Sequence, residues 1–316
     1  MIDVVALGEV LIDFAPVSTD ADGYPTVAAH PGGAPCNFLA ALTKYGAKTA
    51  FIGKIGQDSF GALLHHTLDG LGIDIRGLVS DKSVFTTLAF VTLDASGDRS
   101  FAFARKPGAD TCLRAEEVDR SLIDEARVFH FGTLSLTDEP SRSATKEVVR
   151  YARSQGKLVT FDPNWRPPLW HSEAEAKEQI LWGLAHADVV KISDEEVAFL
   201  WGCTPEEGAQ RVLDCGVKLV FVTCGADGCL FRNGIAQGRA DSLHGITVKD
   251  TTGAGDIFGG SVVWKLLQTG KAPEALTELE LTEAARFACT AAGLSTTRYG
   301  GITSVPARGE VEALLK

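Results

Sequence analysis

Glycines and an alanine surround a single carboxylate, Asp256, in the segment KDTTGAGDIFGG at residues 249–260. A glycine-rich turn before a helix presents backbone N–H groups that bind phosphate, whereas a carboxylate repels phosphate. Three interpretations of the segment compete. It could be only a tight turn, with Asp256 as a favourable charge in the first turn of a helix. It could also bind a dinucleotide, or it could transfer a phosphoryl group.

The dinucleotide interpretation rests on Gly253, Gly255 and Gly259, which form a G-x-G-x-x-x-G pattern. Such a pattern usually follows the first strand of its domain, and an acidic residue about twenty positions later meets the ribose. Here the pattern comes near the end of the chain, and Asp256 would face the pyrophosphate. The sequence also contains no G-x-x-x-x-G-K-[ST] motif, which excludes a Walker-type nucleotide site.

Phosphoryl transfer accounts for the glycines and the carboxylate together. The backbone N–H groups of Gly253, Ala254 and Gly255 can bind the negative charge that develops on a phosphoryl group during its transfer. Asp256 can take the proton from an attacking sugar hydroxyl, as the catalytic aspartate of a kinase does. The segment therefore predicts an anion hole and a general base at neighbouring positions.

The elements that must position this segment alternate between strand and helix patterns. One buried strand is expected at residues 1–16, with Asp13 at its end, followed by a turn-rich stretch at 21–33. Two β-runs around the turn DASGD predict a hairpin. A strand at 244–250 leads into the glycine turn and a long helix. Strands alternating with helices predict an α/β protein with a doubly wound, mostly parallel sheet flanked by helices, whose ligands lie beyond the carboxyl ends of the strands.

Length, charge and cysteines limit the class of protein. The chain has 316 residues and a formal net charge of −11, which argues against a nucleic-acid backbone or an anionic membrane as the main partner. Asp3, Glu9 and Asp13 interrupt the first apolar run, so we interpret it as neither a signal peptide nor a membrane span. Seven cysteines without a C-x-x-C pair favour reduced thiols in a cytoplasmic protein over a zinc site.

Two long motifs resemble those of a known family. The segment at 249–260 resembles the C-terminal signature of the ribokinase-like (PfkB) carbohydrate kinases, and GGAPCNFLAALTKYGAKTAFIGKIGQDSFG resembles their N-terminal one. The resemblance runs from GEVLIDF to YGGITSVP, and FARKPGAD, FDPNWRPPLW and KISDEE look most like fructokinases. It implies one kinase domain over residues 1–316 with a small β-sheet lid from about 10–30 and 85–105. It also implies the use of ATP, Mg²⁺ and, in many members, K⁺.

The resemblance implies a sugar site near the start of the chain. In the family, a diglycine and an asparagine contact sugar hydroxyls, and the matching residues are Gly32, Gly33 and Asn37. A matching aspartate, Asp13, would bind two hydroxyls, which suits the paired acceptor oxygens of a carboxylate. From the residues alone, Asn37 could simply lie in the first turn of a helix, and Asp13 could be a surface acid.

Two arginines lie in stretches that border the sugar pocket in the family, although each could form a structural ion pair instead. They are Arg105, in SFAFARKPGAD, and Arg166, in FDPNWRPPLW. Phe103 and Asn164 belong to the same stretches and are expected in the pocket with them. Phe101 and Phe103 stand where a pocket that binds a carboxylate would more typically offer tyrosine hydroxyls. This favours neutral fructose over 2-keto-3-deoxygluconate.

A nucleotide site is implied at two strand ends. The segment VTCGADG matches the nucleotide-binding strand and turn of the family, although a plain β-turn after a buried strand would look alike; the matching residues are Thr223, Gly225 and Gly228. KISDEE is expected to contribute Lys191 and Ser193 to the same cofactor site.

KISDEE also departs mildly from the family pattern. The family usually has N-x-x-E there, and its glutamate organises Mg²⁺ and phosphates through water. This chain has Ser193 and Glu196, which equally fit a capping box at a helix start. Glu196 is favoured over Asp194 and Glu195 as the residue that faces the metal.

The family often carries a monovalent-cation site beside the anion hole. Asp250 and the carbonyl of Thr252 match one half of that site. The loop that supplies the rest is matched by Ser295, Arg298, Gly300 and Ser304, with the arginine contributing its main-chain oxygen. These hard oxygen ligands are consistent with K⁺, with Na⁺ or with an empty site.

The favoured function is an ATP-dependent fructokinase that phosphorylates the 6-hydroxyl of D-fructose, with Asp256 as the base. The alternatives are a 2-keto-3-deoxygluconate kinase and a catalytically silent sugar-binding protein on the same fold. An intact Asp256 and an intact glycine turn argue against the silent protein, which has no need of a base. The expected partners are a small sugar, ATP and, as in some members, a second subunit that pairs through the lid.

Overall fold

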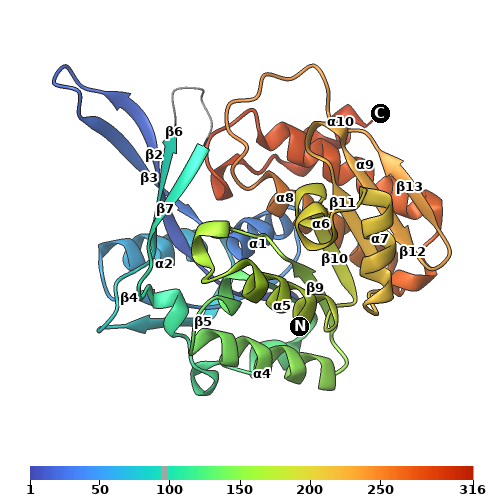
Figure 1. Ribbon diagram of the computed structural model, residues 1–316, viewed down its shortest axis with the longest axis horizontal. Coiled ribbons are helices and arrows are strands. Elements are labelled where there is room, and N and C mark those ends of the chain that lie inside the picture. Colours follow the sequence, from blue (N-terminus) through green and yellow to red (C-terminus); the bar gives the residue numbers. More distant parts are fainter. Residues whose placement is uncertain (94–98, 316) are drawn as a thin grey trace.

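The protein folds around two sheets, a large one at the centre and a small one that projects from its edge (Figure 1). The computed structural model describes the backbone of residues 1–93 and 99–315 and the side chains of residues 1–91 and 102–315. The turn DASGD of the expected hairpin and the side chain of Phe101 therefore lie outside the described residues.

The large sheet is parallel from β11 to β5, and two antiparallel strands extend it at one edge. Within the described residues its order is β13 (Gln237–Ala240), β12 (Cys229–Asn233), β11 (Leu219–Thr223), β10 (Val189–Ser193), β9 (Leu158–Asp162), β8 (Ala126–Gly132), β1 (Ile2–Leu7), β4 (Thr49–Gly56) and β5 (Asp74–Asp81). The direction of winding reverses at β1, which lies between β8 and β4. Ligands of doubly wound sheets bind at such a switch point.

Helices cover both faces of the large sheet. One face packs against α1 (Ala34–Lys44), α2 (Ser59–Leu71), α8 (Ala254–Thr269), α9 (Glu278–Ser295) and α10 (Arg308–Leu314). The other face packs against α3 (Ser121–Glu125), α4 (Ser141–Ser154), α5 (Glu173–Leu184), α6 (Asp194–Trp201) and α7 (Pro205–Asp214). None of these described helices is both long and apolar enough to cross a membrane.

Strand β1 shows why the sheet is buried on both faces. Val5 and Leu7 belong to the core on the α3–α7 side, whereas Val4 and Ala6 belong to the core on the α1 side. Because side chains alternate along a strand, the unbroken apolar run from Val4 to Leu7 contributes to both cores at once. The structure therefore confirms the predicted α/β fold with a doubly wound, mostly parallel sheet flanked by helices.

The small sheet consists of β3 (Pro25–Gly32), β2 (Leu11–Thr19), β6 (Leu88–Leu93) and β7 (Arg99–Ala104), in this spatial order. Its register pairs Asp13 with Ala89 and Ala89 with Phe103, so these side chains share one face of the sheet. Phe14 and Phe90 pair on the opposite face, where their rings stack with centroids 5.2 Å apart. A shift by one residue would turn Asp13 and Phe103 away from the cavity that they line.

The expected single strand at residues 1–16 is wrong. The chain forms β1, leaves the large sheet at Gly8 and continues as β2 in the small sheet. A Cβ on Gly8 would lie 2.6 Å from Cγ of Pro35, so the break is also where the start of α1 packs closely against the backbone. Asp13 consequently lies on the small sheet and not at the end of the first strand.

Two other stretches differ from their expected structure. Part of the turn-rich stretch at 21–33 is strand β3, which tolerates Pro25 and Pro31 because it lies at the edge of its sheet. Residues 244–250 form no strand, because the N–H groups of Lys249 and Asp250 donate to the carbonyl of Thr296 after α9, at 2.7 and 3.1 Å. The glycine turn thus follows a segment held by a helix end.

Candidate active site

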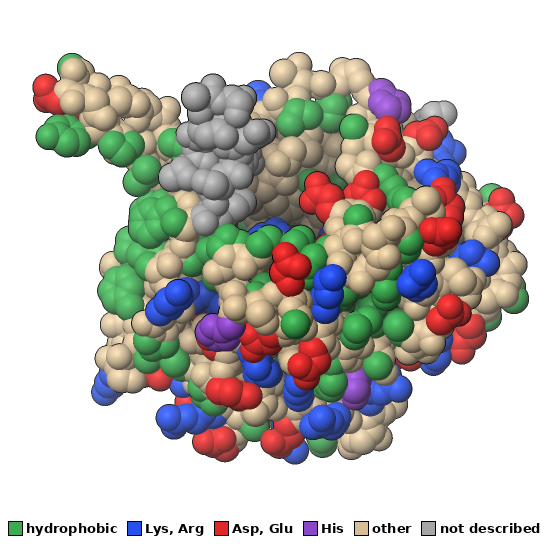
Figure 2. Space-filling model, in the orientation of Figure 1, with side chains coloured by type: hydrophobic (Ala, Val, Ile, Leu, Met, Phe, Trp, Pro, Cys, Tyr) green, Lys and Arg blue, Asp and Glu red, His purple; other side chains and the backbone are tan. Residues whose placement is uncertain are grey.

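A cavity of about 490 Å³ opens between the small sheet and the carboxyl ends of the central strands. Figure 2 shows this face hollowed beside the small sheet, with basic side chains at the floor of the hollow and acidic ones on its rim. The cavity brings together predicted residues from segments far apart in the chain, namely Asp13, Gly33, Asn37, Phe103, Asn164, Arg166, Thr252, Gly253 and Asp256.

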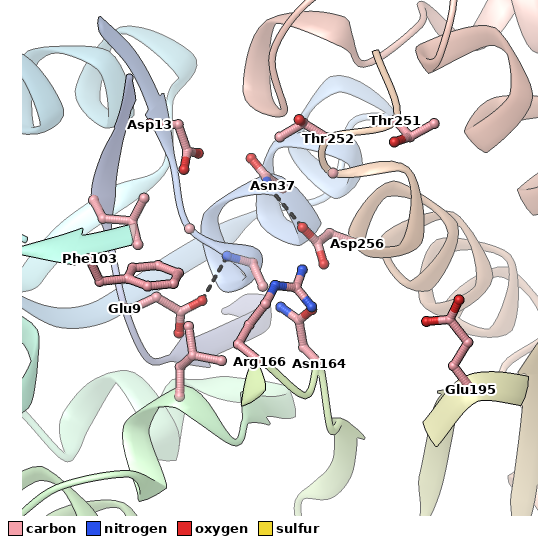
Figure 3. A pocket seen from close by; sticks show the side chains of 15 residues that line it. Glu9, Asp13, Asn37, Phe103, Asn164, Arg166, Glu195, Thr251, Thr252 and Asp256 are labelled. Carbon is pink, nitrogen blue, oxygen red and sulfur yellow. Dashed lines mark hydrogen bonds between the residues drawn. The ribbon is translucent and has the colours of Figure 1, made fainter. Parts of the chain in front are cut away.

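Asp256 lies in the first turn of α8, where its carboxylate is 9 % exposed and turned toward the cavity (Figure 3). Its Oδ2 accepts a hydrogen bond from Nδ2 of Asn37 at 2.8 Å. Burial raises the pKa of Asp256 above its ordinary value, while the Asn37 donor and the positive charges of Lys191 and Arg166 lower it. The raised pKa makes Asp256 a stronger base than an exposed aspartate.

The turn before α8 has the geometry expected of an anion-binding loop. Gly253 is the N-cap of α8 and adopts the left-handed conformation, with φ of 77°, which favours glycine. The N–H of Ala254 donates to the carbonyl of Thr251 at 3.2 Å, so an anion would have to compete for it. A Cβ on Gly255 would lie 3.0 Å from Nζ of Lys191, which sets a positive charge directly beside the turn.

The small sheet and the glycines before α1 form another wall of the cavity. A Cβ on Gly32 would lie 2.3 Å from Oδ2 of Asp13, so the Asp13 carboxylate packs against bare backbone. Burial raises the pKa of Asp13 to about 7. Gly33, with φ of 112°, approaches so closely that a Cβ would lie 2.5 Å from the carbonyl oxygen of Glu9. A side chain at Gly33 would therefore clash with backbone, whereas one at Gly32 would displace the Asp13 carboxylate.

A loop after β9 carries Asn164 and Arg166 to the cavity. Asn164 adopts a positive φ of 45°, which is uncommon for a residue other than glycine. Two carboxylates hold the loop, since the N–H of Asn164 donates to Asp162 at 3.2 Å and the N–H of Trp165 donates to Glu196 at 2.7 Å. The loop therefore joins the sugar side of the cavity to the start of α6.

Arg105 does not line the cavity. Its guanidinium is buried and donates to Asp110 at 2.8 Å, to Thr137 at 2.7 Å and to the carbonyl of Leu134 at 2.7 Å. This network fastens the end of β7 to the segments that follow it and to the turn after β8. Arg105 thus has the structural ion pair that the sequence left open as its alternative role.

The start of α6 is held by Ser193 and Glu196. The Ser193 hydroxyl accepts from the N–H of Glu196 at 3.1 Å, and Glu196 accepts from the N–H of Ser193 at 2.8 Å, which completes a capping box. Both carboxylate oxygens of Glu196 therefore accept backbone N–H groups. Glu195 lines the cavity and lies away from the other labelled side chains in Figure 3.

Lys191 lies on β10 near three carboxylates. Its Nζ is 3.1 and 3.2 Å from the oxygens of Asp162, and the charges of Glu196 and Asp256 also act on it. Burial lowers the pKa of Lys191, but the neighbouring carboxylates outweigh it and the net pKa is raised. Lys191 therefore stays charged beside the turn that begins α8.

The expected nucleotide residues lie at neighbouring strand ends. Ser193 and Thr223 pair as the last residues of β10 and β11. Gly225 and Gly228 follow in a turn and both have positive φ, of 54° and 84°. A Cβ on Gly228 would lie 2.1 Å from the carbonyl oxygen of Ala240, so this turn packs tightly against the end of β13.

Asp250 ties together the two loops expected to hold a monovalent cation. Its Oδ1 accepts from the N–H of Thr252 at 2.8 Å and its Oδ2 accepts from the N–H of Gly300 at 2.9 Å. The side chain of Arg298 binds the carbonyl of Val305 and the carboxylate of Glu310, which leaves a main-chain role for this residue. The hydroxyls of Ser295 and Ser304 donate to nearby carbonyls.

The oxygen-rich loops match the donor chemistry that a hard monovalent cation requires. In the described part of the chain, no group of three or more His, Cys, Asp or Glu side chains could hold a metal. A metal site of that kind therefore has no support there, whereas a site made of backbone oxygens and one carboxylate is compatible with these loops.

Several residues that line the cavity were missed by the sequence reasoning, namely Glu9, Leu11, Ala34, Leu134 and Thr251, whereas Glu195 had been named only as an alternative to Glu196. Glu9 matters most, because its Oε1 accepts the N–H of Ala34 at 2.9 Å and thereby caps α1, whose own N-cap is a glycine (Figure 3). Burial raises the pKa of Glu9 to about 8. The sequence signal that could have identified Glu9 is the presence of an acidic residue inside the first apolar run.

Comparisons with known proteins agree with this site. Residues 1–308 match the model of the pfkB family of carbohydrate kinases. This protein belongs to that family. A curated relative, fructokinase-2 of Solanum lycopersicum, is 41% identical over 99% of this chain and 96% of its own length.

Two solved structures resemble this carbohydrate kinase closely. A fructokinase from Xylella fastidiosa with bound ATP has a TM-score of 0.91 and 31% identity, covering 99% of this chain and 98% of its own. A fructokinase double mutant from Vibrio cholerae O395, bound to fructose, ADP and a potassium ion, has a TM-score of 0.89 and 31% identity, covering 100% and 99%. The fold and the order of site segments therefore belong to a carbohydrate kinase.

Proposed function

We propose that this carbohydrate kinase is an ATP-dependent fructokinase that transfers the γ-phosphoryl group of ATP to the 6-hydroxyl of D-fructose. The observation that carries the proposal is the buried Asp256 beside Gly253 and Gly255, facing a cavity that Asp13 lines from another wall. The relatives named above, with bound ATP in one structure and fructose and ADP in another, support the two substrates.

The proposed reaction needs one proton transfer and one phosphoryl transfer. Asp256 accepts the proton of the 6-hydroxyl as that oxygen attacks the γ-phosphorus, and the bond to the bridging oxygen breaks to release ADP. The N–H groups of Gly253 and Gly255, with the positive end of α8, stabilise the charge on the phosphoryl oxygens. Lys191, held against Gly255, adds a positive charge at the same place.

The nucleotide is proposed to lie along the ends of β10 and β11, where Ser193 and Thr223 are neighbours and the turn with Gly225 and Gly228 follows. Mg²⁺ bound with ATP neutralises phosphate charge in such transfers. Glu196 is proposed to reach it through water, because both its oxygens already accept N–H groups. K⁺ is proposed between the loops that Asp250 joins.

The charge of the cavity favours a neutral sugar over a sugar acid. Four acidic residues line it, namely Glu9, Asp13, Glu195 and Asp256, and Arg166 is its one basic lining residue among the described side chains. Arg105, the other candidate partner for a substrate carboxylate, is bonded to Asp110. Burying a substrate carboxylate among these four acidic residues would be costly, whereas sugar hydroxyls can hydrogen-bond to them.

The test is ADP release by the purified protein with ATP, Mg²⁺ and a panel of sugars, followed by identification of the phosphorylated carbon by ³¹P NMR. We expect fructose 6-phosphate as the main product. Phosphorylation of another sugar would change the substrate but keep the kinase. No ADP release with any sugar would favour the silent sugar-binding protein.

The small sheet is proposed to act as a lid over the sugar and to pair with the lid of a second subunit. Its outer side and projecting hairpin expose Val17, Tyr24, Val27 and Phe90, Phe85 is exposed in the segment before β6, and Figure 2 shows hydrophobic side chains gathered along this flank. Sedimentation velocity should give a dimer that Phe90→Glu converts to a monomer. A monomeric wild type would contradict the pairing.

A cytoplasmic location is proposed from the cysteines. All seven are free thiols, and none is paired in a disulfide. Reduced thiols, including the buried Cys36, Cys229 and Cys289, fit a reducing compartment.

A further inference from the structure

The first turns of α1 and α8 meet at a single side-chain hydrogen bond. Asn37, on α1, is 4 % exposed, and its Nδ2 donates to Oδ2 of Asp256 (Figure 3). One oxygen of the proposed base is thereby engaged by a donor from the protein. The other oxygen, Oδ1, remains to accept the proton of a substrate hydroxyl.

The Asn37 amide is confined on two sides by glycine turns. A Cβ on Gly301 would lie 2.3 Å from Oδ1 of Asn37, and a Cβ on Gly253 would lie 3.1 Å from its Nδ2. Its buried Oδ1 has no hydrogen-bond partner among the described residues. The amide therefore has little room to rotate, and its donor stays aimed at the base.

The helix that carries Asn37 is itself anchored at the cavity. The N-cap residue of α1 is Gly33, which has no side chain to cap the helix, and Glu9 supplies an oxygen from another segment to the N–H of Ala34 at 2.9 Å. The backbone N–H of Asn37 in turn donates to the carbonyl of Gly33 at 3.0 Å. The position of Asn37 is thus fixed at both its backbone and its side chain.

We propose that Asn37 is a positioning residue for Asp256, whose amide donor aims the base and holds it in the ionised form that accepts a proton. This role differs from contact with sugar hydroxyls, because the donor faces the base. The inference rests on the proposed function, since Asp256 must be the general base.

Physical chemistry gives the direction of the effect. A donor to a carboxylate favours its charged form, and in a buried site such a bond is stronger than in water. Burial and the charge of Glu196 oppose ionisation of Asp256, and Lys191 and Arg166 favour it. The other titratable groups that face Asp256 are Asp13 on β2, Cys36 on α1 and Asp162 on β9. Loss of the Asn37 donor leaves this balance shifted toward the protonated form.

The experiment measures kcat against pH, with ATP and fructose saturating, for the wild type, Asn37→Ala and the similarly sized Asn37→Leu. In both variants we expect the acid limb to move up by about one to two pH units, the shift that corresponds to losing a hydrogen bond to a charged group. At pH 6 kcat should fall about ten-fold or more, with partial recovery at high pH.

The control is Asn164→Gly, which removes another amide from the same cavity at a position where φ is already positive. It should raise KM for fructose and leave the acid limb of kcat in place. An unchanged acid limb in Asn37→Leu, with only KM raised, would overturn the positioning role. A wild type that releases no ADP would instead overturn the proposed function, and the inference with it.

Discussion

At the scale of single residues, the cavity owes its chemistry to buried carboxylates. Burial raises the pKa of Glu9 to about 8 and that of Asp13 to about 7, and it also raises the pKa of Asp256. The Asp256 carboxylate accepts a side-chain donor from Asn37 and lies near the charges of Lys191 and Arg166. These interactions favour its ionised form and oppose the effect of burial.

Replacing the base gives the most direct residue-scale prediction. Asp256→Asn keeps the size of the side chain but cannot accept the hydroxyl proton, so turnover should fall by roughly 10²–10⁴-fold with fructose affinity nearly unchanged. Steady-state kinetics and fructose titration of the purified variant measure the two quantities. Turnover like that of the wild type would end the proposed mechanism, and a loss of folding would indicate a helix-capping role instead.

Glu9 gives a prediction about stability and pH. Its folded-state pKa of about 8 lies above the ordinary 4.5, so the folded protein keeps this proton where the unfolded chain releases it. The stability that Glu9 contributes is therefore full below about pH 4.5 and is lost as pH rises through 8. Glu9→Gln keeps an acceptor for the N–H of Ala34 but does not titrate. In urea unfolding, the free energy of unfolding of the variant minus that of the wild type should therefore increase from pH 5 to pH 8. An equal difference at both pH values would contradict this.

Residue types alone could not assign every role. Aspartate and glycine spacing predicted the turn with Asp256, because few other patterns combine N–H donors with a base. Arg105 and Glu196 were ambiguous, since an arginine serves a substrate or an ion pair equally well and S-x-x-E is also a capping box. The partners that decide, Asp110 for Arg105 and the Trp165 N–H for Glu196, depend on tertiary contacts.

At the scale of elements, two helix starts and one loop define the site. α1 brings Asn37, α8 brings Asp256, and the loop after β9 brings Asn164 and Arg166. Because the backbone of Glu9 approaches Gly33 closely, the start of α1 leaves no room for a side chain at this position.

Two glycines at opposite ends of α1 provide a matched pair. Both have positive φ, 112° at Gly33 and 96° at Gly46, but only Gly33 would place a Cβ against backbone, whereas nothing lies within 4 Å at Gly46. Gly46→Ala should cost about 1–2 kcal/mol, the price of a left-handed alanine. Gly33→Ala should cost more than about 2 kcal/mol and lower kcat, because α1 must shift. If thermal unfolding showed the same loss of stability in Gly33→Ala and Gly46→Ala, close packing at Gly33 would not have the role assigned to it.

Strands and helices of the large sheet were predictable because apolar runs and capping signals are local. Helix α7, for example, begins with a capping box of Thr204 and Glu207, whose T-x-x-E spacing can be read from the sequence. The failures had non-local causes. Residues 244–250 bind the end of α9, and the break between β1 and β2 follows from the packing of Pro35 on Gly8. The strand β5 and the helix α10 also went unpredicted, since their patterns are weak.

At the scale of the whole molecule, Asp250 connects the loop before α8 to the loop after α9. If a monovalent cation binds there, it will stabilise the turn that carries the anion hole. Activity should therefore rise when K⁺ replaces choline at constant Mg²⁺ and ionic strength, and Asp250→Ala should lose that response. Equal rates in the two salts would show that these loops hold no activating cation.

The central claim is that this kinase phosphorylates a neutral ketose, because four acidic residues line its cavity and Arg105 is bonded elsewhere. The most direct measurement is kcat/KM for fructose and for 2-keto-3-deoxygluconate in one coupled assay. The value for fructose should be higher by at least about 10²-fold, the scale expected when buried polar groups lose their partners. Comparable or reversed values would contradict the fructokinase assignment and leave a sugar kinase of another specificity.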